Sequence, residues 1–327
     1  MIEIPKIHSY KAFGLNILSD FPLPELIPVS RKNFDEADLT IIETNLSSLW
    51  SKLAEPDAYY YIKKKLCMIK VPGVAIYMIE DGRAISVSPI EGSNNNQIRL
   101  YLLGTCLGVL LMQRKIMPIH GSCIVINGKA YAIVGDSGAG KSTLASAFLS
   151  RGFHLLTDDI MAVTLSEDNI PLAIPSYPQQ KLWQESLDRF GIESDQFKPI
   201  YNRETKFNIP VNDHFVDRSI PLAGIFVLSK ANQNDIEIVS IQKLARFPVL
   251  FHNTYRNFMI NRSGLLDWHF AFSANLANNL DFYRIIRPAS RFTVNELVDN
   301  ILSLITKDIN LIDEKAATIY QKGEIVI

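Results

Sequence analysis

The sequence predicts an α/β (α+β) protein with two domains, a smaller β-rich one over residues 1–94 and a larger one over residues 95–327. Three observations lead to this prediction. Short runs rich in β-branched residues fill much of the first ninety residues, a polar break covers residues 91–96, and strand and helix patterns alternate after it. The 327 residues also leave room for two domains of about 100–200 residues each.

The composition is that of a globular protein. Hydrophobic residues make up 47% and charged residues 20%, which excludes a disordered or fibrous chain. The 33 basic and 34 acidic side chains nearly balance, so binding to nucleic acid or to a membrane surface is not expected as a main function. The N-terminus lacks the pattern of a signal peptide, and the apolar stretch over residues 100–112 is shorter than the ~20 residues of a membrane span. We therefore expect a soluble cytoplasmic protein.

The N-terminal domain is predicted to contain a three-stranded meander. Its strands are the apolar runs over residues 68–71, 74–79 and 84–87. The dipeptides Pro72-Gly73 and Asp81-Gly82 separate them, and both are typical of tight turns.

The second domain is predicted to open with a leucine-rich helix over residues 97–113, which Pro118 ends. Two strands follow, over residues 122–127 and 130–134. They are joined by Asn127-Gly128, a strong signal for a two-residue hairpin turn.

A phosphate-binding loop follows the second of these strands. The segment fits the pattern G-x-x-x-x-G-K-[S/T], and an apolar helical pattern over residues 144–151 comes directly after it. In such loops backbone N–H groups surround a β-phosphate, the lysine reaches the β- and γ-phosphates, and the hydroxyl binds Mg²⁺. The lysine is Lys141 and the hydroxyl belongs to Ser142. The residues predicted to bind a nucleotide are Gly135, Asp136, Ser137, Gly138, Ala139, Gly140, Lys141, Ser142 and Thr143.

An acid pair lies downstream of the loop. The run over residues 153–163 has the pattern of a β-strand that two adjacent carboxylates, Asp158 and Asp159, interrupt. Neighbouring residues of a strand point to opposite faces. One carboxylate can therefore face Mg²⁺ while the other faces the hydroxyl of a substrate.

Together these motifs resemble a known enzyme family. His120-Gly121-Ser122, the loop over residues 135–142 and the run over residues 151–159 are similar in order and spacing to the catalytic domain of HPr kinase/phosphorylase. The resemblance implies an HPr kinase/PEP carboxykinase-like P-loop fold, the use of ATP and Mg²⁺, and a homo-oligomer. It also implies that Asp158 takes the proton from a serine hydroxyl, that Asp159 joins Ser142 at the Mg²⁺, and that His120 lies beside the reacting phosphates.

The chain departs from bifunctional members of that family in three places, one of which is that its first ninety residues do not look like the regulatory half of those enzymes. Thr143 stands where those enzymes have glutamate, and the run over residues 177–183 replaces the glycine-rich stretch linked to phosphorolysis. The whole chain is more similar to HPr-kinase-like proteins encoded with ribosomal peptides, notably lasso-peptide precursor kinases. The segments that carry this likeness lie over residues 10–17, 22–26, 177–183 and 253–256. It implies that the acceptor is a serine near the C-terminal end of a precursor peptide.

Three further cations are candidates for contacts with phosphate or substrate. Arg203 and Lys206 lie in a polar segment before Pro210 that we predict to be a loop, and Arg256 lies in a polar patch between apolar segments. Cations so placed can neutralise charge on a transferred phosphoryl group. The other histidines have no metal-ligand spacing and are expected to be structural or at the surface; they include His154, His214, His252 and His269.

The sequence thus supports a P-loop serine kinase, with a peptide or small protein as acceptor. Two alternatives remain open. One is a kinase for a small molecule such as free serine, which a closed pocket would favour, whereas an open groove beside Trp183 and Arg256 would favour a peptide. The other is a nucleotide-gated protein whose β-rich region, residues 1–94, docks a peptide by strand addition.

Overall fold

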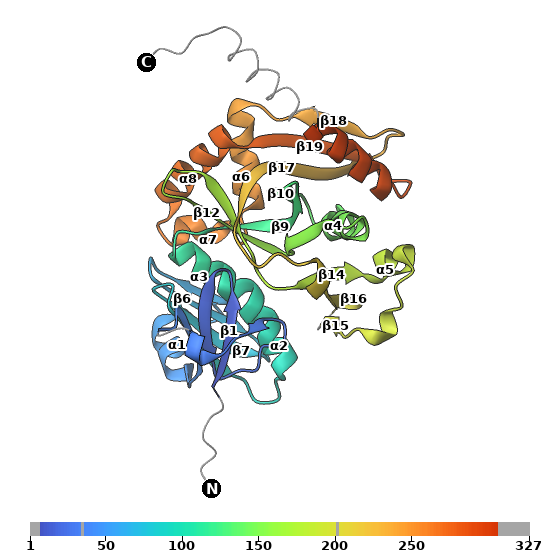
Figure 1. Cartoon of the computed structure of the whole chain (residues 1–327). Coiled ribbons are helices and arrows are strands. Elements are labelled where there is room, and N and C mark those ends of the chain that lie inside the picture. Colours follow the sequence, from blue (N-terminus) through green and yellow to red (C-terminus); the bar gives the residue numbers. More distant parts are fainter. Residues whose placement is uncertain (1–6, 34–35, 201–202, 307–327) are drawn as a thin grey trace.

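The computed structural model describes residues 7–33, 36–200 and 203–306, which form a mixed α/β fold around two large sheets (Figure 1). The predicted fold class is confirmed. The first sheet contains the N-terminal strands, and the second contains the strands that flank the phosphate-binding loop. Within the described residues, no helix combines the length and apolar character needed to cross a membrane.

The N-terminal sheet has eight strands in the order β3-β1-β2-β4-β8-β7-β6-β5. The predicted meander is confirmed, because β6, β7 and β8 pair as antiparallel neighbours and Pro72-Gly73 and Asp81-Gly82 lie at their turns. A short helix, α1 (Ser47–Leu53), lies between β4 and β5. The strands are β1 (His8–Ala12), β2 (Leu15–Ser19), β3 (Ile27–Pro28), β4 (Leu39–Glu43), β5 (Tyr60–Ile62), β6 (Leu66–Val71), β7 (Ala75–Glu80) and β8 (Ala84–Pro89).

The predicted leucine-rich helix is confirmed and runs from α2 (Asn95–Tyr101) to α3 (Leu107–Gln113), with a π-helical segment (Leu102–Cys106) between them. It begins where it does because the side chain of Asn94 accepts the N–H of Gln97, whose side chain in turn accepts the N–H of Asn94. The helix ends at Gln113. Pro118 was expected to end it but lies inside the next strand.

One apolar core joins this helix to both large sheets. Buried residues of the N-terminal strands, of the helix, and of later elements such as Ile160, Ala162 and Met259 pack in a single cluster. The helix therefore lies between the two sheets, as Figure 1 shows. The predicted division into residues 1–94 and 95–327 stays a prediction, and this shared core makes it testable.

We expect a chain truncated to residues 95–327 to lose its cooperative fold. Truncation would expose the buried face of the helix over residues 95–113, including Leu102 and Leu110, which are fully buried in the core shared with the N-terminal sheet. Thermal unfolding and binding of a hydrophobic dye would check this against the full chain. A sharp thermal transition without dye binding in the fragment would show instead that residues 1–94 are an independent domain.

The second sheet contains the predicted hairpin. β9 and β10 pair as antiparallel neighbours, and Asn127 and Gly128 at their turn both have positive φ, as a type I′ turn requires. The order β10-β9-β12-β13-β17-β19-β18 closes partly on itself because β10 also pairs with β17, and β11 adds to β9. The strands are β9 (Met117–Ile126), β10 (Lys129–Val134), β11 (His154–Thr157), β12 (Ile160–Leu165), β13 (Pro171–Ile174), β17 (Ile220–Ala231), β18 (Glu237–Ser240) and β19 (Asp281–Pro288).

A third, small sheet has the order β14-β16-β15. It consists of β14 (Gln179–Trp183), β15 (Pro199–Ile200) and β16 (Arg203–Pro210). The prediction of a loop around Arg203 and Lys206 is therefore wrong, because this segment is a strand that pairs with β15 at Arg203 and with β14 from Lys206 onward. A loop was predicted because the side chains of this segment are polar. They are polar because one face of the small sheet borders a cavity and not an apolar core.

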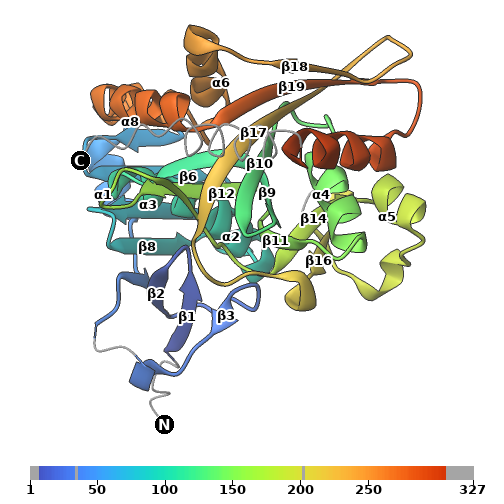
Figure 2. The same ribbon diagram turned by 45° about the horizontal axis from the view of Figure 1, so that its top comes forward.

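The remaining helices surround the second sheet (Figure 2). α4 begins directly at the phosphate-binding loop, and a helix that includes residues 294–306 packs near it through Val294, Leu297 and Val298. The other bounds are α4 (Lys141–Ser150), α5 (Gln184–Phe190), α6 (Arg246–Asn253), α7 (Phe258–Arg262) and α8 (Leu266–Asn279).

Candidate active site

The loop between β10 and α4 has the conformation of an anion-binding loop. Its first glycine, Gly135, has a φ of 137°, and a Cβ there would overlap the carbonyl oxygen of Leu228 on β17. Only glycine fits this position. The N–H of Gly135 donates to Oδ1 of Asn253 at 3.1 Å. Nζ of Lys141 donates to the carbonyls of Gly135 (2.8 Å) and Asp136 (3.2 Å), so the ammonium group lies inside the loop.

The acid pair lies in a sharp turn. Instead of one continuous strand, β11 ends at Thr157 and β12 starts at Ile160, so the predicted strand over residues 153–163 is broken at the carboxylates. Oγ1 of Thr157 donates to the carbonyl of Ile160 at 2.6 Å and closes the turn. Asp159 has a φ of 80°, a conformation that costs energy for a residue other than glycine and is common at functional sites.

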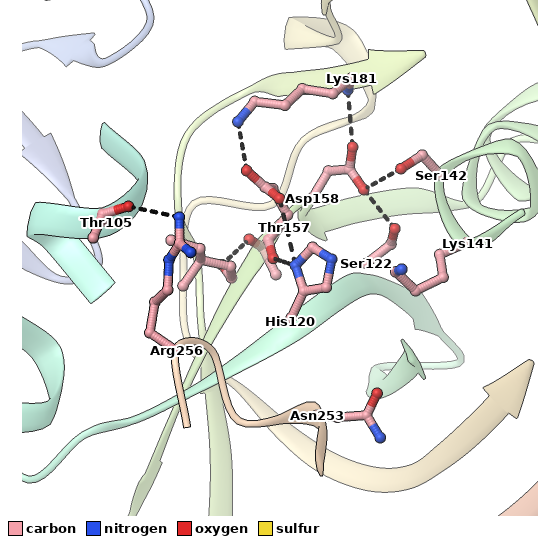
Figure 3. Close-up of polar contacts among 12 residues, drawn as sticks. Thr105, His120, Ser122, Lys141, Ser142, Thr157, Asp158, Lys181, Asn253 and Arg256 are labelled. Atoms are coloured by element: carbon pink, nitrogen blue, oxygen red, sulfur yellow. Dashed lines mark hydrogen bonds and ion pairs between the residues drawn. The ribbon is translucent and has the colours of Figure 1, made fainter. Parts of the chain in front are cut away.

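Three donors hold the carboxylate of Asp158 (Figure 3). The hydroxyls of Ser122 and Ser142 donate to its Oδ1 at 2.5 and 3.0 Å, and the backbone N–H of Lys181 donates to Oδ2 at 2.9 Å. Asp158 is 5% exposed. Both of its oxygens are thus engaged, one of them with the hydroxyl of the phosphate-binding loop.

The carboxylate of Asp159 contacts a lysine and a histidine. Nζ of Lys181 donates to its Oδ2 at 2.5 Å, and Nδ1 of His120 lies 3.5 Å from Oδ1. Burial raises the pKa of Asp159, but the charge and the hydrogen bond of Lys181 oppose burial, and the pKa is held below its ordinary value. Burial lowers the pKa of Lys181, and the pairing with Asp159 raises it further than burial lowers it. Asp159 is therefore ionised at neutral pH.

His120 is fixed on β9 by the turn that carries the acid pair. Its Nδ1 lies 2.9 Å from the carbonyl oxygen of Asp159, which can only accept, so Nδ1 carries a proton. Burial lowers the pKa of His120, Asp159 opposes this, and the net shift is downward. The ring is therefore largely neutral at pH 7, and Nε2 is its remaining acceptor.

The contacts pair Ser142 with Asp158 and not with Asp159. The resemblance had implied that Ser142 and Asp159 share a metal, and the observed pairing favours the opposite division of roles. A hydroxyl and a carboxylate oxygen 3.0 Å apart beside a phosphate-binding loop form an oxygen donor set that suits Mg²⁺, which takes few protein ligands and keeps phosphate and water oxygens. Among the described residues no cluster of three or more His, Cys, Asp or Glu side chains could hold a metal by itself.

Gly121, the residue after His120, is tightly packed against the next strand. Its N–H donates to the carbonyl of Asp159 at 3.2 Å, and a Cβ there would overlap the carbonyl oxygen of Ile133 on β10. We expect Gly121→Ala to push β9 from β10 and to lower the free energy of unfolding by about 1–3 kcal/mol. Urea unfolding would measure this. An unchanged urea midpoint would show that β9 and β10 accommodate the added methyl group without loss of stability.

The predicted cations are only partly accounted for. Lys206 and Arg256 line the same cavity as the acid pair. Nζ of Lys206 lies 5.4 Å from the centre of the Trp183 ring, and the guanidinium of Arg256 donates to Oγ1 of Thr105 at 3.1 Å. Arg203 begins β16, but its side chain lies outside the described part of the chain.

One open cavity of about 1150 Å³ is lined by most of these groups, namely His120, Lys141, Ser142, Asp158, Asp159, Lys181, Lys206 and Arg256. Its walls come from the π-helical segment of the leucine-rich helix, the phosphate-binding loop, the turn that carries Asp158 and Asp159, β14, β16 and the start of helix 294–306. Of the predicted loop residues, those that line it are Ser137, Gly138, Gly140, Lys141, Ser142 and Thr143. Asp136 points outward with an exposed carboxylate, while Ala139 is buried and its carbonyl accepts from Arg287.

Several residues of the site were not predicted from the sequence. Lys181 contacts both carboxylates and Asn253 supports the loop. His252 lies at the surface as expected, and its Nε2 is 3.1 Å from Oδ1 of Asp136 at the edge of the site. Ring packing places Tyr255 beside His120, and its ring fills the space over Gly104 and Gly108. Signals for Lys181 and Asn253 were present, since both lie inside the runs 177–183 and 253–256 that carried the resemblance.

Comparisons with known proteins agree with the motifs. The chain is 38% identical over 64 residues to an HPr kinase/phosphorylase of Mycoplasmopsis pulmonis, which is 19% of this chain and 21% of the relative. It is 27% identical over 145 residues to an HPr kinase/phosphorylase of Lachnoclostridium phytofermentans, which is 42% of this chain and 46% of the relative. These matches show homology to HPr kinase/phosphorylases, and they span less than half the length of each relative.

Among solved structures, the chain is similar to the Hpr(Ser) kinase/phosphatase from Coxiella burnetii. The identity is 14% and the TM-score 0.32, with 63% of this chain and 98% of the other covered. No protein-family model matches the chain.

Proposed function

We propose that this protein is an ATP- and Mg²⁺-dependent kinase that transfers the γ-phosphoryl group of ATP to a serine hydroxyl. One observation carries the proposal: Lys141, Ser142 and two differently held carboxylates line the same cavity. A phosphate-binding loop alone would suit any nucleotide-binding protein. The second carboxylate, Asp159, is ionised and does not contact Ser142. It can therefore orient a hydroxyl group and accept its proton, as a kinase requires.

The two carboxylates would have different roles. Ser142 and Asp158 would hold the Mg²⁺, which when bound neutralises charge on the β- and γ-phosphate oxygens. Asp158 suits this fixed role because three donors already orient it. Asp159 would orient the incoming hydroxyl and accept its proton, in contrast to the division that the resemblance implied.

The transfer step then balances. The serine oxygen forms a bond to the γ-phosphorus while the bond between that phosphorus and the bridging oxygen of ADP breaks. The proton of the hydroxyl passes to Asp159. Lys141, inside the loop, stabilises the charge on the phosphates, and Arg256 and Lys206 are candidates to stabilise the acceptor side.

A peptide or small protein is the proposed acceptor. The cavity that contains the phosphate-binding loop is open, and both Trp183 and Arg256 line it on the side of the acid pair. This supports a groove over a closed pocket for free serine. The relatives are named for HPr, whereas the runs over residues 177–183 and 253–256 favour a ribosomal (lasso) precursor peptide.

Transfer from radiolabelled ATP tests the proposal. Purified protein with Mg²⁺ would be offered HPr, serine-containing precursor peptides, the same peptides with serine replaced by alanine, and free serine. We expect label only on a serine-containing peptide or protein. Label on free serine alone would support a small-molecule kinase. Binding of ATP without transfer to any acceptor would contradict the proposal and favour a nucleotide-gated binding protein.

Lys181 is expected to set the pH dependence of this transfer. Lys181→Met removes the charge that opposes burial, so the pKa of Asp159 rises and the carboxylate protonates at higher pH. The acid limb of the kcat profile should therefore move to higher pH, with activity at pH 5–6 falling more than activity at pH 8. Lys181→Arg keeps the charge and should restore most of the profile.

Both Lys181 variants keep the backbone N–H that holds Asp158, so they affect only the side-chain contact. Thermal unfolding would confirm that each variant folds. A uniform loss of activity at all pH values in Lys181→Met would mean that Lys181 contributes to structure alone.

A further inference from the structure

We propose that the nucleoside end of ATP binds between α5 and the start of helix 294–306, on a platform formed by Arg189 and Phe292. This proposal rests on the proposed function, because it assumes that the loop around Lys141 holds the phosphates. It assigns a binding site to residues that no motif in the sequence indicated.

The direction of the nucleotide follows from the contacts along α4. Ser142 contacts Asp158, which marks the end where the terminal phosphates react. The next residue, Thr143, points away from the acid pair and toward α5, because its Oγ1 lies 2.8 Å from Oγ of Ser186 on that helix. A nucleotide whose β- and γ-phosphates occupy the loop therefore continues past Thr143 toward α5.

Arg189 lies about one helical turn beyond Ser186 on α5 and covers an aromatic ring. Its guanidinium carbon is 5.3 Å from the centre of the Phe292 ring, and Phe190 meets that ring edge-on at 6.4 Å. Figure 2 shows α5 and helix 294–306 near the loop end of α4. Arg189 and Phe292 both line the cavity that contains the phosphate-binding loop.

The chemistry of this end suits a base and a ribose. Phe292 is 41% exposed although it lies at a cavity wall, so ring surface is available for stacking, which is how proteins bind bases of any sequence. Val294 and Leu297 below it are apolar and buried. The hydroxyl of Thr293, on a residue 3% exposed, has no hydrogen-bond partner among the described residues, and Thr293 lines the same cavity.

A second aromatic platform competes for the base. Trp183 is also 41% exposed and has Lys206 near its ring. Trp183 lies two residues after Lys181 on β14, so both side chains are on the same face of the strand, the side of the acid pair. We therefore assign Trp183 to the acceptor and Phe292 to the nucleoside.

Binding of ATP and of inorganic tripolyphosphate, each measured by calorimetry, separates the two platforms. Phe292→Ala should raise the Kd of ATP about tenfold, which is about 1.4 kcal/mol, and leave the Kd of tripolyphosphate unchanged. Phe292→Trp, which keeps a stacking surface, should restore ATP binding. Trp183→Ala is the matched control and should change neither Kd.

The outcomes are distinguishable. Loss of ATP affinity in Trp183→Ala with none in Phe292→Ala would overturn the assignment, and so would an equal loss of ATP and tripolyphosphate affinity in Phe292→Ala. Lys141→Met should weaken both ligands. If it weakens neither, the proposed function fails, independently of where the base binds.

Discussion

Replacement of Lys141 by methionine is expected to lower kcat/KM for phosphoryl transfer by about a thousandfold. The ammonium group lies inside the loop, held by the carbonyls of Gly135 and Asp136, where phosphate oxygens carry their greatest charge. Burial lowers the pKa of Lys141 and the neighbouring carboxylates oppose this, so the group is already partly desolvated before a phosphate arrives. Its interaction with phosphate is correspondingly strong.

The measurement is steady-state transfer from ATP to the acceptor, with ATP affinity determined separately. Lys129→Met, which removes an exposed lysine at the start of β10, is the matched control and should retain full activity. Activity of Lys141→Met within tenfold of the parent protein would show that the loop does not hold the reacting phosphates.

The second large effect concerns the acid pair. Asp159→Asn keeps the shape of the side chain but removes the proton acceptor, so kcat should fall about 10²–10⁴-fold. Added Mg²⁺ should not restore it. Asp158→Asn weakens the proposed metal site next to Ser142, so its activity should recover in part as the Mg²⁺ concentration rises.

This pair of variants decides between two assignments. Recovery of Asp159→Asn, but not of Asp158→Asn, by high Mg²⁺ would return the roles to those implied by the family resemblance. Tripolyphosphate binding without Mg²⁺ and thermal unfolding serve as controls for both variants. Asparagine at position 159 also loses the charge that pairs with Lys181, so stability must be measured alongside activity.

Local elements were predictable because their signals lie within a few residues. The meander of β6 to β8, the hairpin at Asn127-Gly128 and the loop from Gly135 to Ser142 each depend on turn residues and periodicity that act locally. The break between β11 and β12 was harder to predict. The pattern over residues 153–163 is that of a strand, and only pairing with β9 on both sides of the acid turn divides it.

Side-chain partners across long separations were not predictable from the sequence. Lys181 is 22 residues from Asp159, and Asn253 is 118 residues from Gly135. No periodicity links such positions. The segment around Lys206 was predicted to be a loop because its residues are polar, whereas Lys206 lies on a strand that borders the cavity.

The sequence by itself determined that this protein has a phosphate-binding loop between a strand and a helix, followed by two adjacent carboxylates. Those features depend on backbone conformations that neighbouring residues impose. Which carboxylate contacts Ser142 and which contacts the side chain of Lys181 depends on the tertiary structure. The sharp turn at Asp159 and the packing of β14 against it set the direction of each side chain. Roles at the site follow from charges brought together by the fold, and adjacent positions in the chain do not fix them.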